Sequence, residues 1–392
     1  MVFQRKVVEE LASALRRGPR LLQILVGPRQ VGKTTAAWDL AKGLGWPCVF
    51  EAADVSPPPG PEWIETQWQR ARSLAGRPAL LVLDEIQKVS GWSVTVKRLW
   101  DEEQRRPDSL SVVLLGSSSL QLHHGMTESL AGRFLLHRCM HWSFPEVEAA
   151  FGMNLDQWIY FGGYPGAQPF VRDEALWVRY IADALIETAI ARDVLQMHTV
   201  AKPALLRSLF GLAATHPAQI LSWNKMLGQL VDAGNTTTLS HYADLLETAF
   251  LLSALPLYSA GTPRKRAGSP KLVLWNNALV SAFCGRSFAS ARRDGPWWGR
   301  LVENAVGSHL LNQLPRESFN VAYWRDGTQE VDYVVTRARE TWALEVKSGR
   351  PGRTSGLQAF RQRYPAAHAL VIGSGGIPLD EFFADPPSVW FE

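Results

Sequence analysis

The sequence predicts an α/β protein built from several domains. Its 392 residues are enough for two or three domains of roughly 100–200 residues each. Through the first 150 residues, short apolar stretches alternate with amphipathic ones, which indicates a parallel sheet covered by helices on both faces. Helical patterns follow, and a helix with further strands completes the chain. The pattern divides the chain into four expected domains, at residues 1–150, 151–203, 204–284 and 285–392.

Composition narrows the class of protein. Apolar residues make up 46% and charged residues 20%, which excludes disorder, collagen and coiled coil as the main architecture. No apolar run approaches the roughly 20 residues of a membrane span, and the charged amino terminus is unlike a signal peptide. Cys48, Cys139 and Cys284 are far apart and form no CxxC pair. We therefore expect a cytoplasmic protein without a disulfide framework, a zinc site or a membrane anchor.

The first domain shows the strand and helix signals of a parallel sheet. Apolar stretches with the length of buried strands lie at residues 21–26, 47–51, 79–84, 110–116 and 139–144. Amphipathic stretches between them predict helices at residues 34–44, 62–74 and 94–105. In this order a helix connects each strand to the next strand of the same sheet, as in parallel sheets.

The rest of the chain divides into a helical part and a mixed part. Helices are predicted at residues 174–197, 204–215, 222–230 and 236–252, followed by strands at residues 252–259 and 270–274 around a polar tip. Three helices and a two-stranded hairpin outline a winged helix. Beyond the hairpin the pattern reads helix (299–313), strands (319–325, 329–336 and 341–347), helix (356–363) and strand (369–373).

A phosphate-binding motif lies between the first strand and the first helix. The segment from Gly27 to Thr34 fits GxxxxGK[ST] in the context that this motif requires. Its glycines let the backbone approach phosphate oxygens, Lys33 reaches the β- and γ-phosphates, and the Thr34 hydroxyl suits Mg²⁺. The residues expected to hold ATP are Gly27, Pro28, Arg29, Gln30, Val31, Gly32, Lys33, Thr34 and Thr35.

Acidic, hydroxyl and basic residues further along complete a candidate ATPase site. Asp84 and Glu85 end an apolar strand, where Asp84 suits the Mg²⁺ shell and Glu85 suits activation of the attacking water. A hydroxyl in the run Ser117–Ser119 is a candidate sensor of the γ-phosphate, with a plain turn as the alternative. Arg133 is a candidate to stabilise transition-state charge, in its own or a neighbouring subunit, with a surface ion pair as the alternative.

A second constellation of charged residues lies in the last domain. Glu303 is on a predicted helix, Asp332 on one strand, and Glu345 and Lys347 on one face of the next strand. Three carboxylates and a lysine suit one or two Mg²⁺ or Mn²⁺ ions and phosphodiester cleavage. Glu303, Asp332 and Glu345 are the expected ligands, and Lys347 would assist. A decayed or purely structural site is the alternative.

These motifs together give the chain a recognisable family likeness. It resembles the bacterial and archaeal AAA-type ATPases with a C-terminal domain of unknown function, the DUF4143 group. The shared motifs are GPRQVGKTT from Gly27, LDEIQ from Leu83, GSSS from Gly116, SLAGR from Ser129, FGGYP from Phe161, residues 236–247, EVDYV from Glu330 and LEVKS from Leu344. The resemblance implies an ATPase core, a helical lid, a winged helix and a fold similar to PD-(D/E)xK restriction endonucleases, with Glu303, Asp332, Glu345 and Lys347 matching the nuclease pattern. Val331 stands where that pattern has proline, and serine stands at the sensor position.

Basic charge is concentrated in one window of the sequence. The net charge is +4, but residues 261–363 carry 17 Lys and Arg against 8 Asp and Glu. Such a window is typical of nucleic-acid binding, with a solvated surface as the alternative. Arg264, Lys265 and Arg266 at the hairpin tip, with Lys225 on a helix before it, are the predicted contacts to the DNA backbone.

The sequence therefore favours an ATP-hydrolysing, Mg²⁺-dependent DNA-binding protein. The bound nucleotide would control how tightly the C-terminal half binds DNA, which we expect to be branched or to contain ends. The last domain would cut this DNA or only recognise its shape. The competing hypothesis is an ATP-dependent switch that binds a protein partner and cleaves nothing. Self-association stays open.

Overall fold

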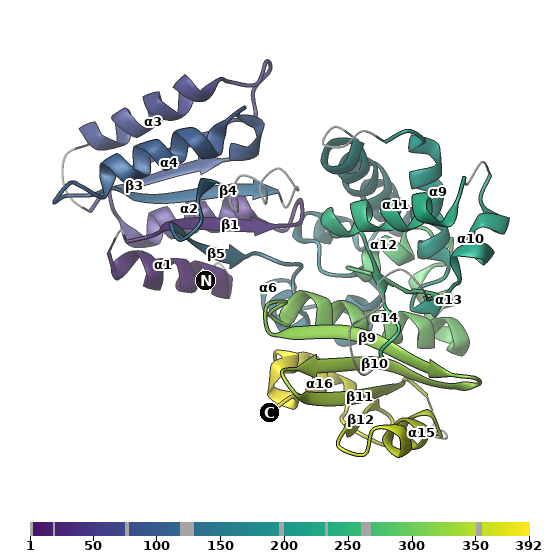
Figure 1. The fold of residues 1–392 in the computed structure, drawn as a ribbon. Coiled ribbons are helices and arrows are strands. Elements are labelled where there is room, and N and C mark those ends of the chain that lie inside the picture. The colour runs from purple at the N-terminus through teal and green to yellow at the C-terminus, as the bar shows by residue number, and fades with distance from the viewer. Residues whose placement is uncertain are drawn as a thin grey trace. The chain divides into compact units, whose positions relative to one another are not determined.

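The computed structural model divides into two compact units. It describes residues 3–18, 20–74, 78–117, 129–195, 200–231, 234–259, 268–349 and 355–392. The N-terminal unit is Met1–Met140 and the C-terminal unit is His141–Glu392 (Figure 1). No described helix is both long and apolar enough to cross a membrane. The finer division of the C-terminal unit at residues 203 and 284 stays a prediction.

The N-terminal unit is built on a parallel five-stranded sheet in the order β2-β3-β4-β1-β5. Its strands are β1 (Leu22–Gly27), β2 (Cys48–Ala52), β3 (Leu80–Asp84), β4 (Ser111–Ser117) and β5 (Phe134–Arg138). Its helices are α1 (Lys6–Arg16), α2 (Lys33–Leu44), α3 (Pro61–Ser73), the short 3-10 helix η1 (Ile86–Lys88) and α4 (Trp92–Glu103). Alternate residues of the central strands bury on opposite faces: Ile24 and Val26 in one apolar core, Leu25 in the other. The predicted α/β class is confirmed for this unit.

One predicted strand of this sheet is wrong. The last strand is β5, not residues 139–144, and the next helix already begins at Phe144. β5 ends in the polar residues His137 and Arg138, so its sequence does not look like a buried strand. His137 is nevertheless buried, and its Nε2 lies 2.8 Å from Gln23 Oε1 on the neighbouring strand. Pairing with a polar partner lets a histidine be buried in this edge strand.

The C-terminal unit begins with helices. They are α6 (Phe144–Phe151), α7 (Leu155–Phe161), the 3-10 helix η2 (Pro165–Phe170), α8 (Glu174–Arg179), the π-helices η3 (Tyr180–Glu187) and η4 (Ile190–Leu195), α9 (Pro203–Thr215), α10 (Trp223–Gln229) and α11 (Thr236–Thr248). Side chains cap the amino ends of α10 and α11. The Ser222 hydroxyl accepts a hydrogen bond from Lys225 N–H, and Asn235 Oδ1 accepts one from Thr238 N–H. The single long helix predicted over residues 174–197 is thus three consecutive helical segments up to Leu195.

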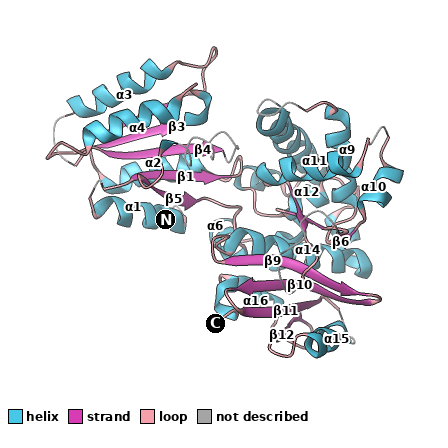
Figure 2. Cartoon of the chain, viewed as in Figure 1, coloured by secondary structure: helices cyan, strands magenta, loops and turns pink. Residues whose placement is uncertain are grey.

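Two small sheets complete the C-terminal unit (Figure 2). One is antiparallel, in the order β6-β8-β7, with β6 (Gln219–Ile220), β7 (Leu252–Leu255) and β8 (Lys271–Leu274). The other, in the order β12-β11-β10-β9, has strands β9 (Phe319–Asp326), β10 (Gln329–Arg337), β11 (Glu340–Lys347) and β12 (His368–Gly373). The helices that follow β8 in this unit are α12 (Asn277–Ser281), α13 (Phe288–Arg293), α14 (Gly295–Gln313), α15 (Ser355–Arg363), α16 (Leu379–Ala384) and the 3-10 helix η5 (Pro387–Trp390).

The β7–β8 hairpin, residues 252–274, is attached to the larger of these sheets. Just beyond β7, Leu257 forms a parallel bridge with Tyr323 of β9. Tyr258 N–H donates to Tyr323 O at 2.6 Å, and the Tyr323 hydroxyl donates to Ser269 O ahead of β8. The hairpin therefore extends the edge of the β9 sheet.

Candidate functional site

The loop between β1 and α2 has the geometry of a phosphate cradle. A Cβ added at Gly27 would lie 1.9 Å from Cys139 O, so only glycine fits there. Gly32, the residue before α2, is left-handed with φ 89°. Lys33 is buried, and its Nζ donates to Gly27 O at 2.9 Å and Pro28 O at 2.6 Å. The ammonium group is thus held against the loop, at the start of a 12-residue helix whose amino end favours anions.

Two oxygen donors from different elements meet beside this loop. Thr34 Oγ1 on α2 donates to Asp84 Oδ2 at the end of β3, at 2.6 Å. Burial raises the pKa of Asp84 above its ordinary value, and the hydrogen bond from Thr34 offsets only part of that effect. A hydroxyl and a carboxylate oxygen this close fit the ligand preferences of Mg²⁺. Thr34 and Asp84 would hold the ion, and this assignment stays a prediction.

Glu85 is fixed by a residue to which the sequence assigned no role. Its backbone is left-handed, with φ 52°, and its N–H donates to Asp84 Oδ1 at 2.8 Å. Gln87 Nε2 donates to Glu85 Oε2 at 2.6 Å and to Ser117 Oγ at 3.1 Å. Ser117 pairs in register with Gly27, so Gln87 connects the carboxylate to the strand next to the phosphate loop. The remaining sensor candidates, Ser118 and Ser119, lie outside the described residues.

A substitution at Gln87 tests this connection. We expect Gln87→Met to lower the kcat of ATP hydrolysis roughly tenfold with little change in KM, because the supporting hydrogen bond orients the carboxylate rather than binding nucleotide. Lys88→Met, one residue on, removes only the ion pair to Asp54 and is the matched control. A Gln87→Met protein with unaltered kcat would contradict the role.

Arg133 does not reach the nucleotide loop of its own chain. Its carbonyl accepts from Leu22 N–H at 2.9 Å, at the amino end of β1, whereas the loop follows the carboxyl end of that strand. The six residues of β1 span roughly 20 Å. Arg133 Nε instead pairs with Asp101 at 2.7 Å. Of the two roles that the sequence left open, one within its own subunit does not fit this position, because Arg133 lies at the amino end of β1 and the loop at its carboxyl end. A role in a neighbouring subunit stays a prediction.

In the C-terminal unit, three carboxylates converge as a cluster. Glu303 on α14 and Glu330 and Asp332 on β10 have carboxylate oxygens within 4.8 Å of one another. Glu303 and Asp332 were predicted to meet; Glu330 was not. Burial and the charge of Asp332 raise the pKa of Glu345, which is not a member of the cluster. Lys347 pairs with Glu345 at 2.5 Å rather than with the cluster.

A buried lysine fills this carboxylate cluster. Lys271 of β8 is fully buried, and its Nζ lies 2.5 Å from Glu303 Oε1, 3.5 Å from Asp332 Oδ1 and 3.6 Å from Glu330 Oε1. Burial alone would lower the pKa of Lys271, but the charges of Glu303 and Asp332 outweigh it and raise the pKa, so the group stays an ammonium ion. All four residues of β8 are buried, including this lysine, whose burial the sequence does not indicate.

The cluster does not fit a divalent metal while Lys271 is in place. Its oxygens have the chemistry that Mg²⁺ and Mn²⁺ prefer. The space that they share, however, is occupied by an ammonium group within ion-pairing distance of all three carboxylates. We derive no cleavage step from this cluster.

The predicted DNA contacts are only partly visible. Lys225 is exposed on α10, and Arg264, Lys265 and Arg266 lie outside the described residues. Several Lys and Arg residues between positions 261 and 363 form ion pairs with carboxylates of the same unit. The pairs are Arg286–Asp294, Arg292–Asp156, Arg300–Glu303, Arg316–Glu247, Lys347–Glu345 and Arg363–Asp326.

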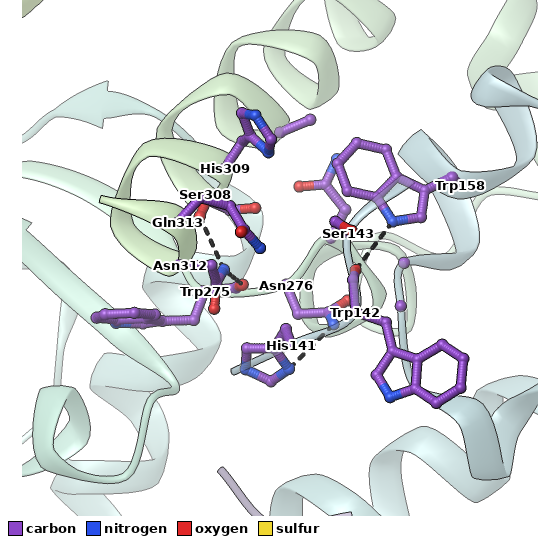
Figure 3. Close-up of a pocket in the computed structure, with 14 residues that line it drawn as sticks. His141, Trp142, Ser143, Trp158, Trp275, Asn276, Ser308, His309, Asn312 and Gln313 are labelled. Atoms are coloured by element: carbon purple, nitrogen blue, oxygen red, sulfur yellow. Dashed lines mark hydrogen bonds between the residues drawn. The ribbon is translucent and has the colours of Figure 1, made fainter. Parts of the chain in front are cut away.

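The FGGYP motif that begins at Phe161 contributes to packing rather than to chemistry. Gly162 and Gly163 line a cavity of about 20 Å³ together with Asn276 and His141, whose side chains hydrogen-bond at 3.2 Å (Figure 3). That volume suits one water molecule and no larger ligand. A Cβ at Gly162 would lie 1.9 Å from Asn276 Oδ1, so the motif permits close packing against the segment before α12.

Comparison with protein families identifies the class of the N-terminal part. Residues 20–148 match the family model of an AAA domain, so this part of the chain is similar to AAA domains. Residues 153–290 match a domain of unknown function, DUF8612, and residues 298–380 match another, DUF4143. The predicted AAA and DUF4143 matches are confirmed.

Comparison with individual proteins adds little to the family matches. The Holliday junction branch migration motor RuvB of Thermotoga maritima is 18% identical, with a TM-score of 0.34 over 65% of this chain and 90% of that one. The Orc1 protein of Aeropyrum pernix, in complex with DNA, is 15% identical, with a TM-score of 0.30 over 73% and 93%. Scores this low carry no inference about the present chain. No curated protein matches it.

Proposed function

We propose that the chain is an ATP-hydrolysing protein in which the nucleotide state of the AAA domain controls DNA binding by the C-terminal unit. The observation that carries the ATPase part is the meeting of Thr34 and Asp84 at 2.6 Å beside Lys33. A motif match alone would not require side chains from α2 and β3 to converge on one point. Their convergence supports a working nucleotide site.

Each residue of that site has a task in hydrolysis. Lys33, now held by two loop carbonyls, neutralises the β- and γ-phosphates when ATP takes their place. Thr34 and Asp84 would hold Mg²⁺, which would compensate the charge that develops on the phosphate oxygens. Glu85 accepts the proton of the attacking water, and Gln87 keeps its carboxylate oriented.

The proposed DNA contact is the loop of the β7–β8 hairpin. The order helix, strand, helix, helix, strand, strand from α9 to β8, with β6 paired to β8, supports a winged helix at residues 204–284. The hairpin loop is the wing in that arrangement, and it carries Arg264, Lys265 and Arg266. Contacts from such residues to phosphates give affinity without reading sequence.

The last domain is proposed to bind without cutting. The order of α14, three strands, α15 and β12 supports a fold similar to PD-(D/E)xK nucleases. The carboxylate cluster does not fit the metal that cleavage requires, so we propose no nuclease activity. ATP with Mg²⁺ at the AAA domain is the cofactor of this account, and no Mn²⁺ site is proposed in the C-terminal unit.

A second candidate function is a switch that binds a protein partner. The observation that favours it is the internal pairing of the basic window, because an arginine already paired with a carboxylate offers less charge to a phosphate. The two candidates differ in what the hairpin loop contacts.

Charge reversal at the hairpin loop separates these candidates. We expect Arg264→Glu, Lys265→Glu and Arg266→Glu together to weaken binding of duplex DNA at least roughly tenfold and to flatten its dependence on salt, since about three phosphate contacts are lost. The matched control reverses Arg16, Arg17 and Arg20, which are exposed in the N-terminal unit and give the same change in net charge. Fluorescence anisotropy at several salt concentrations measures both. Equal effects of the two triple variants, or no DNA binding at all, would favour the protein partner.

A further inference from the structure

We infer that Lys271 is a built-in cation that takes the place of a metal ion in the cluster of Glu303, Glu330 and Asp332, and thereby fixes the β7–β8 hairpin to the last domain. This inference is independent of the proposed ATPase and DNA-binding activities. It rests on where one side chain lies and on the charges around it.

The first argument is the position of the ammonium group. Its Nζ lies within 3.6 Å of an oxygen of each carboxylate, and these oxygens come from α14 and β10. The side chain of Lys271 has no exposed surface, whereas those of Glu303 and Asp332 are 12% and 16% exposed. The lysine thus fills the inner side of the cluster, where its three carboxylates can share one cation.

The second argument is charge balance. Three carboxylates carry a formal charge of −3; Lys271 and Arg300, whose guanidinium lies 3.2 Å from Glu303 Oε2, return +2. The nearby Glu345 is paired separately with Lys347. A divalent ion added to this set would leave an excess of positive charge next to a buried ammonium, an arrangement that burial makes costly. The cations of the chain itself therefore compensate all but one of the three negative charges.

The third argument is the origin of the lysine. Lys271 belongs to β8 of the hairpin, while its partners belong to the helix and sheet of the last domain. The same hairpin also joins that sheet at its edge, through Leu257 and Tyr258 bonded to Tyr323. The ion cluster and this edge pairing hold both strands of the hairpin, so the hairpin and the β9–β12 sheet behave as one body.

Mn²⁺ binding to the nucleotide-free full-length chain tests this inference. Asp84→Asn is placed in every protein to remove a ligand of the N-terminal unit, and free Mn²⁺ is counted by electron paramagnetic resonance. With Lys271 present, we expect Asp332→Asn to leave Mn²⁺ binding unchanged, because no ion uses the cluster. With Lys271→Met, we expect about one additional Mn²⁺ per chain, bound at least roughly tenfold more tightly than any in the parent and lost again when Asp332→Asn is added.

The contrary results are equally specific. Mn²⁺ that binds the Lys271 protein and is lost with Asp332→Asn would show that the cluster accepts metal beside the lysine, and would overturn the inference. This comparison does not depend on the folding of Lys271→Met. A folded Lys271→Met protein that gains no Mn²⁺ would also overturn it, because the position would then not suit a metal.

Discussion

Glu85→Gln should abolish most ATP turnover while leaving nucleotide binding intact. The amide keeps the shape of the side chain and can still bond to Gln87, but it cannot take a proton from water. Loss of a positioned general base costs about 10²–10⁴-fold in rate. Steady-state phosphate release gives the rate, and binding of a fluorescent ATP analogue shows whether the site is otherwise preserved.

Glu102→Gln is the matched control for this prediction. Glu102 lies on α4 of the same unit, with 48% of its side chain exposed and an ion pair only to Arg98. We expect its turnover to remain within about twofold of the parent, since exposed ion pairs contribute little. A Glu85→Gln protein that hydrolyses ATP as fast as the control would show that another group activates the water.

Lys271→Ala should be the most destabilising single change in the C-terminal unit outside its apolar core. Removing one partner of a buried ion cluster leaves the others uncompensated, which typically costs about 3–5 kcal/mol in free energy of unfolding. Here Glu303, Glu330 and Asp332 lose their shared cation, and the hairpin loses its attachment to α14 and β10. Urea unfolding followed by tryptophan fluorescence measures the change.

Arg300→Ala provides the comparison, because Arg300 contacts the same carboxylate from an exposed position. Its side chain is 43% exposed and reaches Glu303 Oε2 at 3.2 Å. We expect it to cost about 1 kcal/mol or less. Equal losses from Lys271→Ala and Arg300→Ala would mean that burial adds nothing to the Lys271 cluster, and that the hairpin is held by other contacts.

The nucleotide site could be predicted closely because its signals are local. The motif from Gly27 to Thr34 is continuous, and the flanking strand and helix were predicted within a residue of β1 and α2. Asp84 could be added because the carboxyl ends of parallel strands meet at one edge of a sheet. Gln87 could not, since its role depends on how η1 turns back toward Ser117.

Arg133 and Lys271 show what local patterns leave out. A short motif around Arg133 gives no sign that it lies just before a strand, and the strand itself was predicted too late in the chain. Lys271 opens an apolar strand beside a basic loop, which in sequence looks like one more exposed charge. Its role depends on the packing of β8 against α14 and β10, far from it in sequence. Glu303 and Asp332 could be predicted to meet, whereas Glu330 and the cation that these carboxylates share could not.

ATP turnover of the full chain, alone and with single-stranded, duplex, forked and four-way-junction DNA at equal nucleotide concentration, tests the proposed coupling most directly. The account predicts that at least one DNA shape stimulates turnover, and that reversal of charge at Arg264, Lys265 and Arg266 removes the stimulation while basal turnover persists. Turnover that is unchanged across the panel, in a protein that hydrolyses ATP, would contradict control of DNA binding by nucleotide.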